Sequence, residues 1–379
     1  MRKYAVAIVV FYIMFAWAGC KEDTTRFFPI MPSAGDTVAL AGLYGSERAD
    51  SAWKSVFLDF SREVQTGVLR SSWDLGFYCA NDTFRVIINS ALGATAAQTD
   101  KTNLNSITDA DTAVLASSKK LVLKIDTGDI TTVDPVQGDK AAYLSGTVIK
   151  AISASSSANN VYIIKRGANT NLRFNKWIKV KIDRTSNGYT VTYGFMSDNN
   201  NLYTTLTVTK DPSYNWRYVS FSSRTSSYEP AKTSWDICWG NNTYVAMNAD
   251  GTLITNPSGT VRAQQQPDFV QINFLAGVTA YEVIPGNDPT KIYDNFTEAD
   301  ALAIPQASWS AKRDAIGAKW RRLTANDVGG SLDINIDRFY LVKDAKGNIY
   351  SVSFAGGGSR ANQIVRYKRL HDAETTTTN

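Results

Sequence analysis

Residues 339–354 read FYLVKDAKGNIYSVSF, two short apolar runs separated by polar residues. In the second run, Tyr350, Val352 and Phe354 alternate with serines, which is the period-two pattern of a strand with one buried face. Lys346-Gly347-Asn348 separates the two runs and supplies residues that tolerate positive φ in a tight turn. The stretch therefore predicts an antiparallel β-hairpin.

The same alternation recurs further from this hairpin. Ile178, Val180 and Ile182 would face one side of another strand, and Ser186-Asn187-Gly188 marks the turn after it. Most of the chain reads in this way. We therefore predict a mainly β fold built from antiparallel sheets.

Helical periodicity is sparse. It is limited to Asp109–Ser118 and to Ser308–Trp320, where Trp309, Ile316 and Trp320 could share one face of a helix. We expect few, short helices.

Three short motifs occur twice along the chain in the same order. The first copies are Trp73-Asp74-Leu75, Val161 to Lys165 and Thr190 to Tyr193, and the second copies are Trp235-Asp236-Ile237, Phe339 to Lys343 and Ile364 to Tyr367. A shared order favours tandem duplication over chance similarity between two β-rich halves. We expect two tandem β domains, residues 35–211 and 212–370, divided near the turn at Lys210-Asp211-Pro212-Ser213, and a disordered tail over residues 371–379.

The first residues read as a bacterial lipoprotein signal. Arg2 and Lys3 are followed by an apolar run from Tyr4 to Trp17 and then by Ala18-Gly19-Cys20. The apolar run is shorter than the ~20 residues of a membrane-spanning helix. We predict a signal peptide over residues 1–19, lipidation at Cys20 and a lipid anchor in the membrane.

The residues after Cys20 suggest where the anchored protein goes. Lys21-Glu22-Asp23 resembles the export tags of Bacteroidetes surface lipoproteins. We expect a tether over residues 20–34 and exposure on the outer face of the outer membrane.

Composition excludes several classes of function. The formal net charge of +5 is too small to indicate nucleic acid binding. The single histidine, His371, argues against histidine triads and histidine metal sites, and no phosphate-binding loop, Cys-x-x-Cys or HExxH motif is present. We expect no enzyme. Cys79 and Cys238 could form a disulfide or remain buried thiols.

The C-terminal half resembles the HmuY family of haem-binding lipoproteins from Bacteroidetes. The resemblance covers Trp216 to Leu370 and rests on Trp235-Asp236-Ile237, Phe339 to Asp344, Gly347 to Tyr350, Phe354 and Tyr367, with a weaker copy in the N-terminal half. It implies a compact antiparallel β fold of HmuY-like type. It also implies uptake of haem or a related porphyrin from host haem proteins and delivery to a TonB-dependent outer-membrane receptor.

The haem ligands of this family have no counterpart here. The resemblance implies paired histidines or methionines before the strand at Phe339, but residues 262–336 contain neither residue type, and residues 92–160 also lack both. As substitutes, Tyr281, Tyr293, Trp309 and Trp320 could line an apolar slot, with a tyrosinate as the iron ligand. Core packing of these aromatic residues is the alternative.

Other motif residues have simpler explanations. Met247 is expected to fill space in the core. Trp73 and Trp235 suit equivalent core positions, and the carboxylates of Asp74 and Asp236 could bond nearby backbone amides.

Three functions remain open from the sequence. The first is a cell-surface lipoprotein that binds haem or a porphyrin without the usual axial ligands. The alternative is a glycan-binding or protein-binding lipoprotein that keeps the fold, which the 9 Trp, 18 Tyr and 16 Phe residues favour. A hydrolase with two carboxylates ranks third.

Overall fold

The computed structural model describes residues 33–43, 53–80, 82–123, 128–167, 177–248, 252–321, 334–355 and 363–374. Ser33–Asn379 forms one compact unit. Cys20 and Lys21-Glu22-Asp23, predicted as lipidation site and export tag, lie outside the described residues. Within the described ranges, no helix is long and apolar enough to cross a bilayer.

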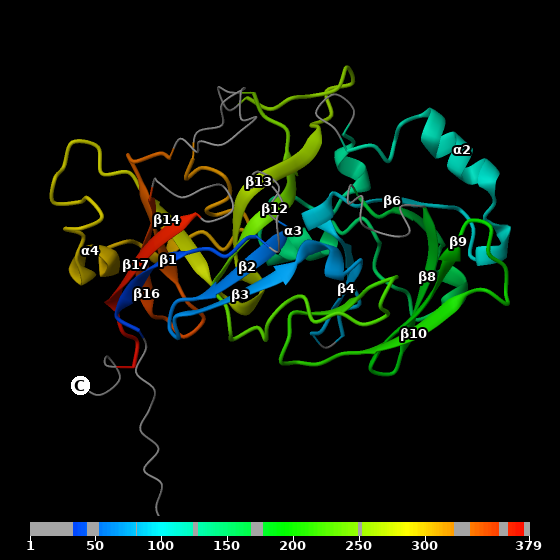
Figure 1. Cartoon of the computed structure of the whole chain (residues 1–379), viewed down its shortest axis with the longest axis horizontal. Helices are drawn as coiled ribbons and strands as arrows, with labels where there is room; N and C mark the ends of the chain where they lie inside the picture. The colour runs from blue at the N-terminus through cyan, green and yellow to red at the C-terminus, as the bar shows by residue number, and fades with distance from the viewer. Residues whose placement is uncertain are drawn as a thin grey trace, which may run out of the picture. The chain divides into compact units, whose positions relative to one another are not determined.

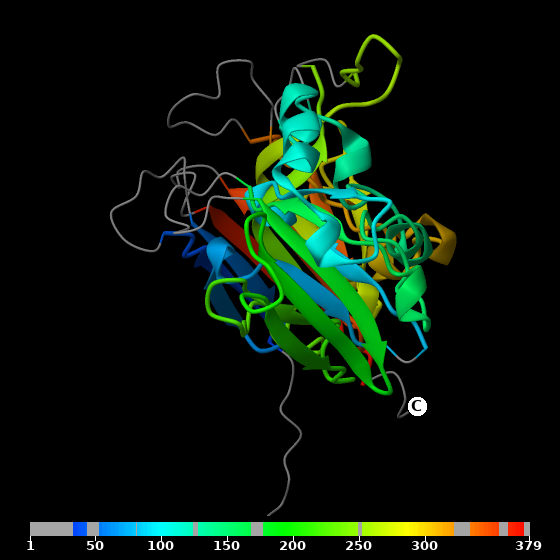
Figure 2. The same ribbon diagram turned by 90° about the vertical axis from the view of Figure 1, so that its right-hand side faces the viewer.

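Two antiparallel sheets that share one apolar core form what we call the first sandwich. The five-stranded sheet has the order β10-β9-β8-β7-β6, with bounds Thr204–Thr209, Gly188–Phe195, Ile178–Thr185, Tyr162–Lys165 and Thr95–Gln98. The three-stranded sheet has the order β11-β4-β5, with bounds Trp216–Val219, Leu75–Tyr78 and Val86–Ile88. Both sheets bury side chains in the same core, for example Val180, Val191 and Phe77. Figure 2 shows strands of the five-stranded sheet, in green, running side by side.

The second sandwich has the same plan. Its five-stranded sheet has the order β1-β17-β16-β15-β14, with bounds Gly35–Ala39, Ile364–His371, Ile349–Ala355, Phe339–Lys343 and Thr279–Val283. Its other sheet has the order β13-β12-β2-β3, with bounds Ala263–Ile272, Ile237–Val245, Lys54–Asp59 and Val64–Leu69. Trp239, Val342 and Val352 lie in the core between the two sheets. The mainly β prediction is therefore confirmed.

The hairpin predicted at residues 339–354 forms as β15 and β16, which pair antiparallel. Its turn is held by Asp344, whose carboxylate accepts hydrogen bonds from the backbone N–H of Lys346 at 2.8 Å and of Asn348 at 2.9 Å. Gly347 has a φ of 101°, which a side-chain-bearing residue rarely adopts. The turn chemistry read from the sequence thus explains this register.

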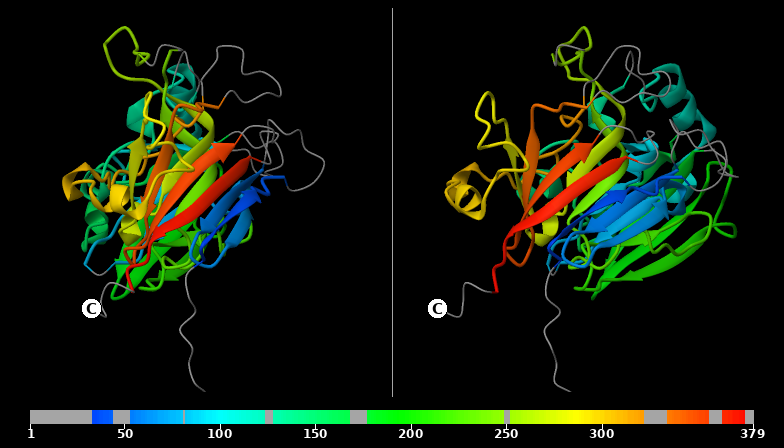
Figure 3. Two further views of the ribbon diagram at one scale, coloured as in Figure 1. Left: turned by 90° about the vertical axis from the view of Figure 1, so that its left-hand side faces the viewer. Right: turned by 60° about the vertical axis from the view of Figure 1, so that its left-hand side comes forward.

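The two sandwiches exchange strands. In the first, β10 lies beside β9 and β11 beside β4, whereas in the second the equivalent places beside β17 and β12 are taken by β1 and β2. Figures 1 and 3 show the N-terminal strand β1 next to the C-terminal strand β17. The repeated motifs occupy equivalent places, because β7 matches β15 and β9 matches β17. The first sandwich is thus completed by β10 and β11, which precede Trp235-Asp236 in the sequence. The second is completed by β1 and β2, which precede Trp73-Asp74.

This exchange corrects the predicted domain limits. Residues 35–69 were expected in the first domain, but β1, β2 and β3 belong to the sheets of the second sandwich. The expected boundary at 211/212 also falls between β10 and β11, which both belong to the first sandwich. The predicted tail is wrong at its start, because His371 is the last residue of β17.

Short helices connect the strands. The α-helices are α2 (Asp109–Ser117), α3 (Lys140–Ser145) and α4 (Glu298–Leu302). The 3-10 turns are η2 (Arg70–Ser72), η3 (Ser90–Leu92), η4 (Leu104–Ser106), η5 (Ile130–Thr132), η6 (Ser156–Ala158), η7 (Phe274–Ala276) and η8 (Gln306–Ser308). The helix predicted at 109–118 is confirmed as α2.

The helix predicted at 308–320 does not form. Ser310 instead bridges to Ala280 of β14, and Gly317 bridges to Val270 of β13. The aromatic periodicity misled because Trp309 and Trp320 pack into different clusters, on opposite faces of the β14–β17 sheet.

We expect the fragment Arg70–Arg224 to fold by itself, because every core residue of the first sandwich lies between Leu75 and Phe221. Cooperative thermal melting, followed by circular dichroism, would check this. The fragments 36–210 and 212–370 should not melt cooperatively, because the first lacks β11 and the second lacks β1 and β2. Separate cooperative melting of those two fragments would instead support a boundary at 211/212.

Candidate functional site

The aromatic residues predicted to line a slot do not come together as one. Tyr281 and Trp309 pack with ring centroids 6.3 Å apart, and Tyr293 meets Phe339 edge-on at 5.7 Å. These side chains lie in an apolar cluster on the outer face of the β14–β17 sheet, beneath the segment that contains α4. Trp320 lies on the inner face, stacked on Phe354 at 4.5 Å. The alternative interpretation, core packing, describes this arrangement.

The candidate tyrosine and histidine ligands of haem iron make packing or polar contacts within the protein. Burial raises the pKa of Tyr293, so its phenol stays neutral at physiological pH. The chain's only imidazole, His371, has its Nδ1 2.7 Å from the carboxylate of Glu298. Met247 is half-buried against a third apolar cluster, as expected for a space-filling residue. Within the described residues, no three His, Cys, Asp or Glu side chains group to hold a metal ion.

Cys79 and Cys238 are both buried free thiols. Burial raises the pKa of each thiol above its ordinary value, so neither is activated as a nucleophile.

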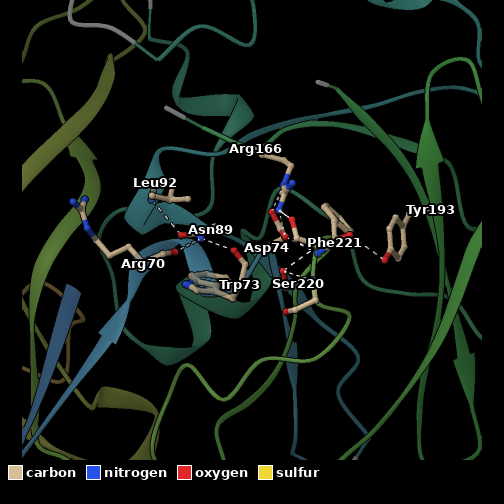
Figure 4. A network of polar contacts seen from close by, with 11 residues as sticks. Arg70, Trp73, Asp74, Asn89, Leu92, Arg166, Tyr193, Ser220 and Phe221 are labelled. Carbon is tan, nitrogen blue, oxygen red and sulfur yellow. Dashed lines mark hydrogen bonds and ion pairs between the residues drawn. The ribbon is translucent and has the colours of Figure 1, made fainter. Parts of the chain in front are cut away.

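The Trp-Asp motif of the first sandwich is the centre of a buried polar network (Figure 4). Asp74 accepts a hydrogen bond from the backbone N–H of Phe221 at 2.7 Å, and its two oxygens face Arg166 at 2.6 and 2.7 Å. Asn89 donates to the backbone carbonyl of Trp73 at 2.7 Å. This network ties β11 and β7 to the motif. It confirms the predicted bond between Asp74 and a backbone amide.

The second Trp-Asp motif repeats the backbone bond but not the arginine. Asp236 accepts from the backbone N–H of Phe60 at 2.8 Å. Arg166 is the first residue after β7, and the equivalent first residue after β15 is Asp344. The second motif therefore has an acid where the first has an arginine. Burial raises the pKa of Asp236 well above its ordinary value. The two motifs are alike in geometry and different in charge.

A concave site with aromatic walls lies near the start of β11 and in the segment after it. It has an outer pocket of about 200 Å³ and an inner cavity of about 50 Å³. Four residues line both parts: Trp216, Tyr218, Tyr228 and Glu229. We call the two parts together the aromatic pocket.

Packed rings form the walls of the aromatic pocket. Tyr228 lies 5.1 Å from Trp73 and 5.3 Å from Tyr218 between ring centroids, and Tyr218 meets Trp73 edge-on at 4.9 Å. Trp216 packs against Tyr78 at 5.0 Å. Aromatic pairs at these separations add stability beyond area burial, so the walls are rigid.

Glu229 lies between these rings and is only 6% exposed. Its carboxylate accepts from Asn215 at 2.7 Å, Tyr218 at 2.8 Å and Trp235 at 3.2 Å. These donors are neutral, and burial raises the pKa of Glu229 to about 7. The carboxylate therefore changes charge near neutral pH.

Polar groups complete the inner cavity. Asn273 accepts from Asn215 at 2.9 Å, and the buried Nε1 of Trp73 has no hydrogen-bond partner among the residues that the structure describes. Arg313 lines the cavity with its guanidinium held by Gln271 at 3.1 Å and Asn242 at 2.5 Å. A cavity with a free donor, a carboxylate and amide groups has the composition of a small-ligand site.

Sequence reasoning did not find the aromatic pocket. Trp216 and Tyr218 stand two residues apart and so share one face of β11, and Tyr228-Glu229 follows ten residues later. That density of aromatic residues is visible in the sequence. The pocket could not be predicted because Trp73, which also lines it, lies in the other half of the chain.

We expect Glu229→Gln to stabilise the protein at pH 8 by about 1–3 kcal/mol, because a shift of roughly one pKa unit is worth ~1.4 kcal/mol. The folded protein holds the Glu229 proton to about pH 7, whereas the unfolded chain releases it near pH 4.5. Stability contributed by this group therefore falls as pH rises between those values. Urea unfolding at pH 8 and pH 5 should show the gain shrinking at pH 5.

The exposed control Glu298→Gln should change the free energy of unfolding by less than ~0.5 kcal/mol at either pH. A destabilised Glu229→Gln protein at pH 8 would contradict the assignment of Glu229 as a strained acid.

Comparison with protein families gives one match. Residues 213–365 match the model of the HmuY protein family, so the resemblance is confirmed over this C-terminal part of the chain. The searches of curated proteins and of solved structures found no match. The matched range includes Trp216, Tyr218, Tyr228 and Glu229.

Proposed function

We propose that this chain is a cell-surface binding protein of the HmuY type, with the aromatic pocket as its ligand site. One observation carries the proposal: Trp216, Tyr218 and Tyr228 surround a buried carboxylate at a pocket that opens to solvent. Rigid aromatic walls with a few fixed polar groups are the usual composition of a recognition site. The pocket lies within the range that matches a family of binding proteins, and we propose no catalytic step.

Pocket size favours a small ligand group over a tetrapyrrole. Pockets that enclose drug-sized ligands measure ~300–1,000 Å³. The outer pocket, at about 200 Å³, suits one ring or one side chain of a larger ligand. At the aromatic pocket, size therefore favours a glycan-binding or protein-binding function over uptake of haem or a porphyrin.

Location and partners belong to the same proposal. Lipidation at Cys20 and export by Lys21-Glu22-Asp23 would place the pocket outside the cell, where host molecules are available. A TonB-dependent outer-membrane receptor is the proposed partner if the ligand is imported.

We expect Cys20→Ser to release the protein from membranes or to block its maturation, because acylation needs the Cys20 thiol. Labelling cells with palmitate and fractionating their membranes would check this. Equal palmitate incorporation in Cys20→Ser and in the wild type would contradict it.

Haemin added to the purified protein should give no sharp six-coordinate low-spin spectrum, because residues 92–160 and 262–336 contain neither histidine nor methionine. The Soret band is the measurement. A low-spin Soret spectrum would overturn the preference for a ligand other than haem.

The pocket itself is tested by ligand-observed NMR with a library of small fragments. Fragment signals should appear with the wild type and be lost in Tyr214→Ala and Trp216→Phe, which alter the outer pocket. Trp177→Phe, at the outer layer of the first sandwich, is the matched control and should retain them. Signals unaffected by the two pocket variants would place the ligand site elsewhere.

A further inference from the structure

Glu229 is a buried acid without a cation. Its three hydrogen-bond donors, from Asn215, Tyr218 and Trp235, are all neutral, and no ion pair involves it within the described part of the chain. Most buried carboxylates are paired, because an isolated buried charge is strongly destabilising. By contrast, Asp74 in the first sandwich has the guanidinium of Arg166 at 2.6 Å. The structure thus contains a negative site that lacks its counter-charge.

The surroundings of Glu229 suit a positive group. The rings of Trp216, Tyr218 and Tyr228 line the same pocket, and aromatic faces attract ammonium and guanidinium groups. The carboxylate retains a place for one more donor. An ionised carboxylate offers about four acceptor positions, and the three hydrogen bonds leave Oε2 with only Tyr218.

Glu229 is one of the residues that line a pocket open to solvent. Glu229 lines the outer pocket of about 200 Å³ as well as the inner cavity of about 50 Å³. The outer pocket has the exposed residues Ser227 and Arg217 at its rim. A slender chain with a charged end could therefore enter past the rim and end at Glu229.

Two cations near the pocket have other partners. Arg217 at the rim lies 3.7 Å from Asp211 and over the ring of Tyr214 at 5.2 Å. Arg313 in the inner cavity is bonded to Gln271 and Asn242 and lies over the ring of Tyr143 at 5.6 Å. Neither forms an ion pair with Glu229 in the described residues. Arg217 should nevertheless repel a cationic ligand weakly at the entrance.

We propose that the aromatic pocket binds a primary ammonium or guanidinium group on a slender aliphatic chain, with its N–H donating to Oε2 of Glu229 and the rings of Trp216, Tyr218 and Tyr228 around it. This inference rests on the proposed function and names the chemical class of its ligand. A free amine and a lysine or arginine side chain of a protein share this chemistry.

The test compares probes of equal length and different charge. Butylammonium, butylguanidinium, 1-butanol and butyrate are titrated into the purified protein at pH 8, with tryptophan fluorescence and calorimetry as readouts. We expect both cations to bind at least tenfold more tightly than 1-butanol, and butyrate to bind more weakly still.

Variants locate the effect. Glu229→Gln should weaken butylammonium binding at least tenfold while the affinity for 1-butanol stays the same, and Arg217→Ala should strengthen it severalfold. Glu298→Gln, an exposed acid in the second sandwich, should have no effect. Because Glu229→Gln is expected to be more stable than the wild type, lost binding would not reflect unfolding.

Binding should also weaken from pH 8 to pH 5, as Glu229 gains its proton. The other titratable groups that interact with it are Tyr143, Tyr218, Tyr228, Cys79 and Cys238, and burial raises the pKa of each above its ordinary value. Burial also raises the pKa of Asp134, near Arg313 and Tyr143, to about 7, so the pH dependence is assigned to Glu229 by its loss in Glu229→Gln.

The outcomes separate this inference from the proposed function. Equal affinity for butylammonium and 1-butanol, or unchanged binding in Glu229→Gln, would overturn the cation inference, although fragment binding at Trp216 would still support the pocket. If no probe and no fragment binds, both the cation inference and the proposed function of the pocket are wrong. Tighter binding of Nα-acetyl-lysine methylamide than of butylammonium would identify a protein side chain as the source, and weaker binding would identify free amines.

Discussion

The arrangement of this protein depends on two reciprocal hydrogen bonds made by the aspartates of its Trp-Asp motifs. Asp74 accepts from the backbone of Phe221, and Asp236 accepts from the backbone of Phe60. In each case the donor follows a strand that precedes the other motif, so each bond fixes an exchanged strand to the sandwich it completes. Because the carboxylates are buried, loss of either bond would leave a polar group without compensation.

The same exchange places the aromatic pocket. The bond at Phe221 ends β11 beside β4, and the chain then crosses towards the second motif at Trp235. Tyr228 and Glu229 lie on that crossing segment. The pocket thus combines Trp73 from one motif, Trp216 from the exchanged strand and Trp235 from the other motif. A ligand bound at this junction would therefore contact residues of both Trp-Asp motifs.

Much of the fold was predictable from local chemistry in the sequence. The pairing of strands that lie far apart in the sequence was not. The hairpin at 339–354 and the helix at 109–118 were predictable because a few neighbouring residues determine them. The place of β1 beside β17 was not, since no local pattern encodes a partner more than 300 residues away. The same limit applied to the predicted ligand site. Tyr281 and Trp309 were recognised as aromatic residues near the strand β15. Both faces of β15 are buried, and these two side chains pack against one of them. Glu229 escaped notice because a single acid acquires meaning only from the rings that enclose it.

The strand exchange also imposes an order on folding during synthesis. Strands β1 and β2 are made first, but their partners β17 and β12 are made late, so these early strands stay unpaired until most of the chain is available. The first sandwich has no such delay, because β4 to β11 are consecutive. Pairings of such large sequence separation form slowly and leave apolar edges exposed meanwhile. The second sandwich can therefore be completed only after β17, its last strand, has been made, whereas the first sandwich can fold earlier.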